Sequence, residues 1–272
     1  MSGGHREAGA DLLWSISTGI DSALRAFVDR QPLSEFYDLV RYHLGWPAEG
    51  HELLRPRSVL CVVACQTCGG SFDSALPMAV AIALLHSFEL NQEDLERHRR
   101  VRNGRKSVWS VWGTPQAMNA GDGMHALAKM ALLDGRGRLQ PAAILHLEQL
   151  LDECCLRCCE VIHSEQAADH LEFGSGEESD IVELAARKGA ILFGCAAYAG
   201  CYLAGDGESR QGAQIRRFGE LLGSAAGVKA LSAERADSLQ AEALTALEAA
   251  GVAAEHCAAL RSLADYVLDG EV

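Results

Sequence analysis

Apolar residues recur at helical spacing along almost the whole chain, and this periodicity limits the possible folds more than any other feature. Stripes within residues 12–27 and 144–162 carry apolar side chains three or four positions apart, which places them on one face of a helix. No segment alternates apolar and polar residues between hairpin turns, and β-branched residues are few. Glycine-containing breaks at 69–70, 121–123 and 205–207 divide the pattern. The sequence predicts an all-α bundle of about ten helices in a single domain, 1–272, with two closing helices between Ala233 and Leu268.

Charge and composition exclude several classes of function. The net charge of −13 argues against a nucleic-acid-binding protein, although residues 97–106 form one basic segment. We found neither a run of about 18 apolar residues nor the hydrophobic stretch of a signal peptide, so we expect a cytoplasmic protein without a membrane span. The ten cysteines lack the paired spacing of a zinc site, and we expect reduced thiols between packed helices.

Two motifs are specific enough to indicate a family. Residues 112–122 read WGTPQAMNAGD, and residues 59–70 read VLCVVACQTCGG. The first is similar to W-G-x-x-x-A-I-N-A-G-D and the second to V-L-C-I-A-A-C-E-L-V-G-G, both found in trans-prenyl diphosphate synthases. Over roughly Tyr42–Tyr266 the chain resembles that family, and in particular plant-type geranylgeranyl diphosphate synthases and their small subunits. The resemblance implies the isoprenoid-synthase fold, a helical bundle around a central cavity.

The resemblance also implies a magnesium site that is largely lost. The family holds magnesium with two D-D-x-x-D motifs. The first matches Glu93, Asp94 and Arg97, and the second matches residues 230–234, where only Glu234 is acidic. Arg97 lies four residues after Glu93, so the two side chains can pair on one helical face. A carboxylate engaged by an arginine is a poor ligand for a hard cation that needs several oxygens.

The residues that would contact substrate are also partly replaced. The family's G-G-K-R-L-R-P reads GHELLRP at 50–56, with Glu52 in place of the lysine that holds the homoallylic diphosphate. Asn103 replaces the second arginine of the family's R-R-G loop. The resemblance still assigns contacts with the diphosphate to Arg55, His86, Arg102 and Lys188. It also implies that Gln166 and Asp169 are polar residues of the cavity.

Three functions remain open from these residues. The first is a non-catalytic, regulatory subunit that forms a homodimer or a heterodimer with an active prenyl diphosphate synthase and needs no cofactor. The second is an active but altered prenyltransferase or terpene synthase that uses Mg²⁺ with Glu93, Asp94, Arg102 and Lys188. The third is a protein that binds a prenyl diphosphate without turnover. The lost carboxylates favour the first.

Overall fold

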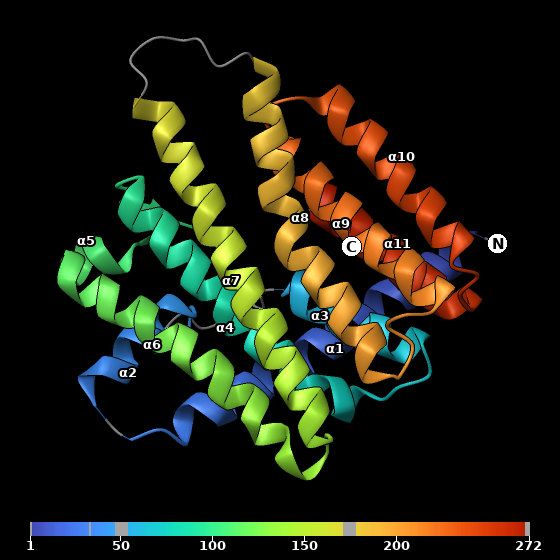
Figure 1. The fold of residues 1–272 in the computed structure, drawn as a ribbon, viewed down its shortest axis with the longest axis horizontal. Coiled ribbons are helices and arrows are strands. Elements are labelled where there is room, and N and C mark those ends of the chain that lie inside the picture. Colours follow the sequence, from blue (N-terminus) through green and yellow to red (C-terminus); the bar gives the residue numbers. More distant parts are fainter. Residues whose placement is uncertain (1, 33, 47–53, 171–177, 270–272) are drawn as a thin grey trace.

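The computed structural model describes residues 2–32, 34–46, 54–170 and 178–269, with the backbone alone for 2–8, 165–170 and 178. This part of the chain contains eleven α-helices, one short 3₁₀ helix and one two-stranded hairpin (Figure 1). The helices are α1 (Ser2–Asp29), α2 (Glu35–His43), α3 (Pro56–Thr67), α4 (Phe72–Glu96), α5 (Val108–Trp112), α6 (Thr114–Leu133), α7 (Pro141–His170), α8 (Glu178–Leu203), α9 (Arg210–Val228), α10 (Ala233–Ala249) and α11 (Ala254–Asp269). The predicted all-α bundle and its two closing helices are confirmed.

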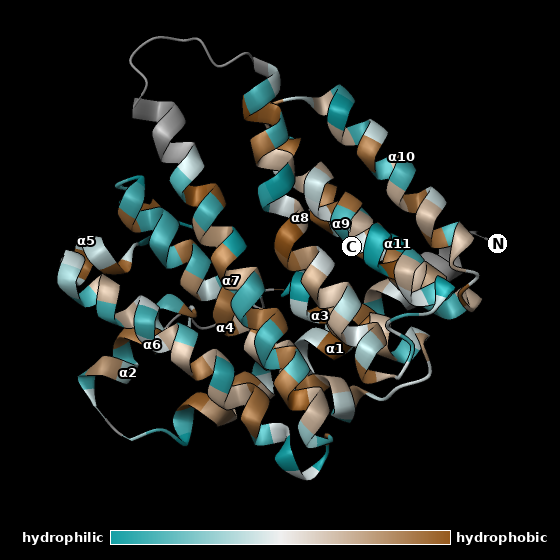
Figure 2. Cartoon of the chain, in the orientation of Figure 1, coloured by the Kyte–Doolittle hydropathy of each residue, from teal (hydrophilic) through white to brown (hydrophobic). Residues whose placement is uncertain are grey.

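Helix α4 is the central helix of the bundle. It contacts α1, α3, α6, α7 and α8, and Figure 1 shows it behind α7. Ser71 and Ser74 form a reciprocal capping box that starts it. In Figure 2, hydrophobic residues occur along much of α8. Among the described helices, α4 alone has the length and hydropathy of a membrane span, and 72% of that window is buried, as in the core helix of a soluble bundle.

Helices α8 and α9 pack backbone against backbone. A Cβ atom added to Gly189 would lie 1.9 Å from the carbonyl oxygen of Gly223, and one added to Gly223 would lie 2.2 Å from the carbonyl oxygen of Gly189. No side chain larger than hydrogen fits there without separating the helices. This contact sets the separation of α8 and α9 beside Lys188, the residue before Gly189.

One of the predicted glycine breaks is wrong. Residues 69–70 and 205–207 lie in turns, but α6 runs without interruption through Gly121-Asp122-Gly123. A Cβ atom at Gly123 would lie 2.1 Å from the Phe36 ring, so this glycine admits a neighbouring helix instead of ending its own. Close packing therefore explains the glycine better than turn chemistry does.

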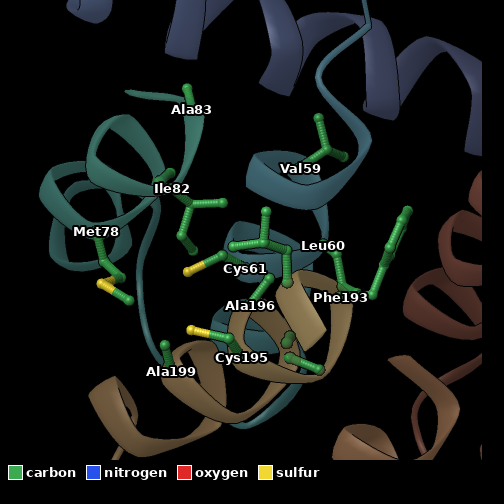
Figure 3. Packing of buried hydrophobic residues seen from close by; sticks show 14 of the residues in the cluster. Val59, Leu60, Cys61, Met78, Ile82, Ala83, Phe193, Cys195, Ala196 and Ala199 are labelled. Carbon is green, nitrogen blue, oxygen red and sulfur yellow. The ribbon is translucent and has the colours of Figure 1, made fainter. Parts of the chain in front are cut away.

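The cysteines lie mainly at helix contacts, as predicted. All ten are free thiols, and seven are buried. Figure 3 shows Cys61 of α3 and Cys195 of α8 packed among apolar side chains that include Ile82 and Ala196. Burial raises the pKa of the Cys61 thiol well above its ordinary value, which keeps it protonated and inert.

A short hairpin follows α4 where the sequence suggested a loop. Strands β1 (Val101–Arg102) and β2 (Arg105–Lys106) are antiparallel, with Arg102 opposite Arg105. The turn residues Asn103 and Gly104 have φ angles of 49° and 73°, which is the mirror-image turn that Asn-Gly favours. Asn103 therefore shapes this segment as well as replacing an arginine.

Candidate functional site

A cavity of about 490 Å³ opens between α2, α3, α4 and the hairpin. Part of its wall is apolar, with Leu44, Leu54, Ile82, Leu90 and Val108. The rest is polar and includes one carboxylate, Asp94, together with the basic and imidazole groups of His43, Arg55, Arg57, His86, Arg102, Arg105 and Lys106. The structure thus brings three of the predicted diphosphate contacts, Arg55, His86 and Arg102, to one cavity whose charge suits an anion.

Arg55 is held in place by a carboxylate of the first helix. Its Nη2 lies 2.8 Å and its Nε 3.2 Å from Oδ1 of Asp21. Burial would raise the pKa of Asp21, but hydrogen bonds from Arg25 and Arg55 outweigh burial and lower it. Asp21 therefore stays ionised and fixes Arg55 at the cavity wall. Glu52 and Leu53, from the same sequence motif, lie outside the described residues.

Both histidines of the cavity are neutral at pH 7. Burial lowers the pKa of His43 to about 4, and the charge of Arg102 adds to the effect. Burial and the nearby Arg57 and Arg55 hold the pKa of His86 well below its ordinary value. Each ring therefore offers a neutral donor or acceptor, and the positive charge of the cavity comes from arginine and lysine.

Glu93 and Asp94, at the end of α4, are surrounded by cations of the same chain. Arg102 Nη2 lies 2.7 Å from Glu93 Oε2 and 2.8 Å from Asp94 Oδ1. Glu93 Oε1 receives Arg99 Nη2 at 3.4 Å and Lys188 Nζ at 3.4 Å. Arg97 Nε is 3.7 Å from the same oxygen, which confirms the pairing expected from the sequence.

The two carboxylates respond differently to this environment. Burial would raise the pKa of Glu93, but Lys188, Arg102 and Arg99 outweigh it, and the pKa is lowered. For Asp94 burial prevails over the bonds from Arg102, and its pKa is raised. Both oxygens of Glu93 are thus engaged by cations, which leaves a poor environment for Mg²⁺ and its octahedral oxygen shell.

The remaining acid of the predicted metal motifs does not complete a metal site. Glu234 is exposed in the first turn of α10. Within the described part of the chain, no three histidine, cysteine, aspartate or glutamate side chains are grouped so that they could hold a metal ion. The residues present therefore do not fit a magnesium cluster. Gln166 and Asp169 fall in the last turns of α7, and their side chains lie outside the described residues.

Four basic or imidazole groups of the cavity were not among the site residues predicted from the sequence: His43, Arg57, Arg105 and Lys106. Arg57 follows Arg55 by two positions at the start of α3, and its guanidinium lies 4.7 Å from the centre of the Phe193 ring. Arg105 lies 4.4 Å from the Tyr42 ring centre and donates to the Tyr42 carbonyl. The Asn-Gly turn could have indicated Arg105, because it pairs Arg102 with Arg105 across a hairpin. No comparable local signal pointed to Arg57.

Comparison with known proteins identifies the family. The family profile described as Polyprenyl synthetase matches residues 47–226, which is more than half of the chain. The chain belongs to the polyprenyl synthetase family. The geranylgeranyl diphosphate synthase of Mycobacterium tuberculosis is 33% identical over 72% of this chain and 55% of its own length. A (2E,6E)-farnesyl diphosphate synthase of Mycobacterium bovis is 31% identical over 68% of this chain and 52% of its own. This polyprenyl synthetase homologue thus spans about half the length of these curated relatives.

Solved structures support the fold over nearly the whole chain. The polyprenyl synthetase from Streptomyces coelicolor A3(2) superposes with a TM-score of 0.80 at 22% identity, covering 95% of this chain and 99% of its own. An FPP/GFPP synthase from Zymomonas mobilis gives a TM-score of 0.80 at 20% identity, covering 96% and 99%. The predicted isoprenoid-synthase fold is confirmed.

Proposed function

We propose that this polyprenyl synthetase homologue is a non-catalytic subunit that pairs with an active prenyl diphosphate synthase in isoprenoid biosynthesis. One observation carries the proposal. The acids of the first motif are neutralised by Arg97, Arg99, Arg102 and Lys188, so they are not available as a set of metal ligands. In the residues that match the second motif, 230–234, Glu234 is the one acid, and it is exposed in the first turn of α10. Ionisation of an allylic diphosphate needs charge stabilisation of the leaving group, which the family supplies through metals.

Exposed apolar side chains on three helices support pairing with a homologous chain. Six large ones lie on α5, α6 and α7, of which α6 contacts the other two: Val111 and Trp112 of α5, Met118, Met130 and Leu133 of α6, and Leu145 of α7. Where such side chains form a continuous patch on a soluble protein, a partner surface usually covers it. We infer that a second bundle with the same helices is the partner.

A turnover assay tests the loss of activity. The purified chain is incubated with Mg²⁺, isopentenyl diphosphate and an allylic diphosphate, and we expect no diphosphate release and no longer prenyl chain. Arg97→Asp should restore little turnover, because Arg102 and Lys188 still engage Glu93 and the residues that match the second acidic motif, 230–234, are unchanged. Metal-dependent release by the unmodified chain, abolished by Glu93→Ala, would instead establish the active-enzyme alternative.

Co-expression tests the partnership. We expect the chain to co-elute with an intact prenyl diphosphate synthase in size-exclusion chromatography, and Met118→Asp combined with Met130→Asp to abolish co-elution. Leu231→Asp is the matched control, because Leu231 is also an exposed apolar residue but lies at the turn between α9 and α10. A chain that stays monomeric with every homologous synthase would refute the proposal.

The cavity favours a second candidate, a protein that binds a prenyl diphosphate without turnover. Its basic side chains suit the diphosphate, and its apolar residues suit an isoprenoid tail. Farnesyl diphosphate that protects the chain against thermal unfolding, in the absence of any partner, would support this function. Protection that is lost in Arg55→Met would place the ligand in this cavity.

A further inference from the structure

The hairpin that follows α4 has two faces with different chemistry. Arg102 is paired with Arg105 across the two strands, and Val101 is paired with Lys106. Paired residues share one face of a hairpin, and successive residues of a strand lie on opposite faces. The half-buried Arg102 and Arg105 therefore form an inner face, toward the cavity. Val101 and Lys106 form an outer face, where Val101 is 53% exposed.

The sequence around the outer face is rich in cations and free of acids. Residues 97–121 contain no aspartate or glutamate and six basic side chains: Arg97, Arg99, Arg100, Arg102, Arg105 and Lys106. The two acids just before this segment, Glu93 and Asp94, are already bonded by Arg102. The local charge of the outer face is therefore positive, although the whole chain carries a net charge of −13.

Hydrogen bonds hold this basic segment in place. The indole Nε1 of Trp109 donates to the Arg99 carbonyl oxygen at 2.9 Å. The carbonyl oxygen of Arg100 accepts from the backbone nitrogen of Ser107 at 2.9 Å and from the Ser110 hydroxyl at 3.0 Å. The Arg100 guanidinium lies 5.7 Å from the centre of the Trp109 ring. The exposed position of the segment is thus part of the fold, and little ordering is needed when a partner binds.

We propose that the outer face, formed by Arg100, Val101 and Lys106, docks on the surface of an anionic lipid bilayer. An aliphatic side chain surrounded by cations suits that surface, because the cations lie among anionic head groups while the aliphatic group enters the boundary with the acyl chains. Acids elsewhere on the protein do not prevent docking, since exposed charges farther away than about 10 Å are largely screened at physiological salt. Because the hairpin forms one wall of the cavity, docking brings that cavity next to the membrane.

The experiment is sedimentation of the full chain with lipid vesicles. We expect binding to vesicles of equimolar phosphatidylcholine and phosphatidylserine, none to phosphatidylcholine alone, and release as salt is raised. Arg100→Gln should weaken binding about fivefold, which corresponds to the about 1 kcal/mol that one basic residue contributes at such a surface. Lys106→Gln should act alike, but Lys106 also borders the cavity, so Arg100 is the more specific probe.

Two further variants separate docking on lipid from a general effect of charge. Val101→Ser keeps the charge and should weaken vesicle binding about fivefold, because it removes the aliphatic group that enters the bilayer. Arg217→Gln is the matched control, since Arg217 is an exposed arginine of α9, which lies well apart from α5 in Figure 1, and it should leave binding unchanged. Circular dichroism verifies the fold of each variant.

Four results would overturn the inference: no binding to the mixed vesicles, equal binding to phosphatidylcholine alone, the same loss in Arg217→Gln as in Arg100→Gln, or full binding by Val101→Ser. Tighter binding to single-stranded RNA than to the mixed vesicles would assign the outer face to nucleic acid instead. The inference does not rest on the proposed subunit role, because the chain is tested without a partner and the variants leave Met118 and Met130 unchanged. Failure of either proposal leaves the other standing.

Discussion

Replacing Arg102 by methionine removes the one side chain, among the described residues, whose hydrogen bonds reach both Glu93 and Asp94. The Arg102 side chain is 17% exposed and Asp94 is 3% exposed, so the change leaves Asp94 buried without its partner. No other side-chain hydrogen bond from the described residues reaches the Asp94 carboxylate. Removing one member of a buried ion pair typically costs about 3–5 kcal/mol.

Two compensations place the expected loss for Arg102→Met near the lower end of that range, at about 3 kcal/mol. Glu93 keeps Lys188 and Arg99, and Asp94, whose pKa burial already raises, can take up a proton. The measurement is urea unfolding at pH 7, in a double-mutant cycle with Asp94→Asn. The free energy of unfolding should fall much less in the double variant than the sum of the losses in the two single variants, because Asp94→Asn removes the charge that Arg102→Met leaves unpaired.

The exposed pair of Arg216 with Glu220 provides the control for Arg102→Met. Its Nε–Oε1 distance is 2.9 Å, but both side chains are more than 40% exposed, so Arg216→Met should cost less than about 1 kcal/mol. A loss for Arg102→Met as small as that of the control would refute the reasoning. The reasoning would also be refuted if the losses in free energy of unfolding for Arg102→Met and Asp94→Asn were strictly additive, because the interaction energy between the two residues would then be zero.

Two further predictions follow from packing and titration. Gly223→Ala should lower the free energy of unfolding in urea by about 3 kcal/mol, because its Cβ atom would lie 2.2 Å from a backbone oxygen. Gly137→Ala is the control: its Cβ atom would meet no atom within 4 Å, so the free energy of unfolding should hardly change. His43, with a folded pKa lowered from 6.5 to about 4, stays neutral while the unfolded chain takes up a proton. The stability that neutral His43 contributes is therefore complete above pH 6.5, and on the order of 2–3 kcal/mol is lost as the pH falls toward 4. In His43→Asn, the free energy of unfolding should depend less on pH between 6.5 and 4. Equal pH dependence in both proteins would contradict this assignment.

The sequence alone determined the features that depend on near neighbours along the chain. Helical periodicity and the two family motifs predicted the bundle and its closing helices. The four-residue spacing of Glu93 and Arg97 predicted their ion pair, because one helical turn places such side chains on the same face. The loss of carboxylates from the two acidic motifs also follows from the sequence alone, because the residue type at a position does not depend on the fold.

Only the tertiary structure decided what surrounds Glu93. Lys188 is 95 residues away and reaches Glu93 because α8 packs against α4 in the bundle. Arg102 was assigned to a diphosphate by resemblance, yet it bonds Glu93 and Asp94 because the Asn103-Gly104 turn folds its strand back beside the end of α4. Spacing along one helix fixes which neighbours can meet, but contacts between elements depend on how closely their backbones approach, and no local pattern encodes that distance.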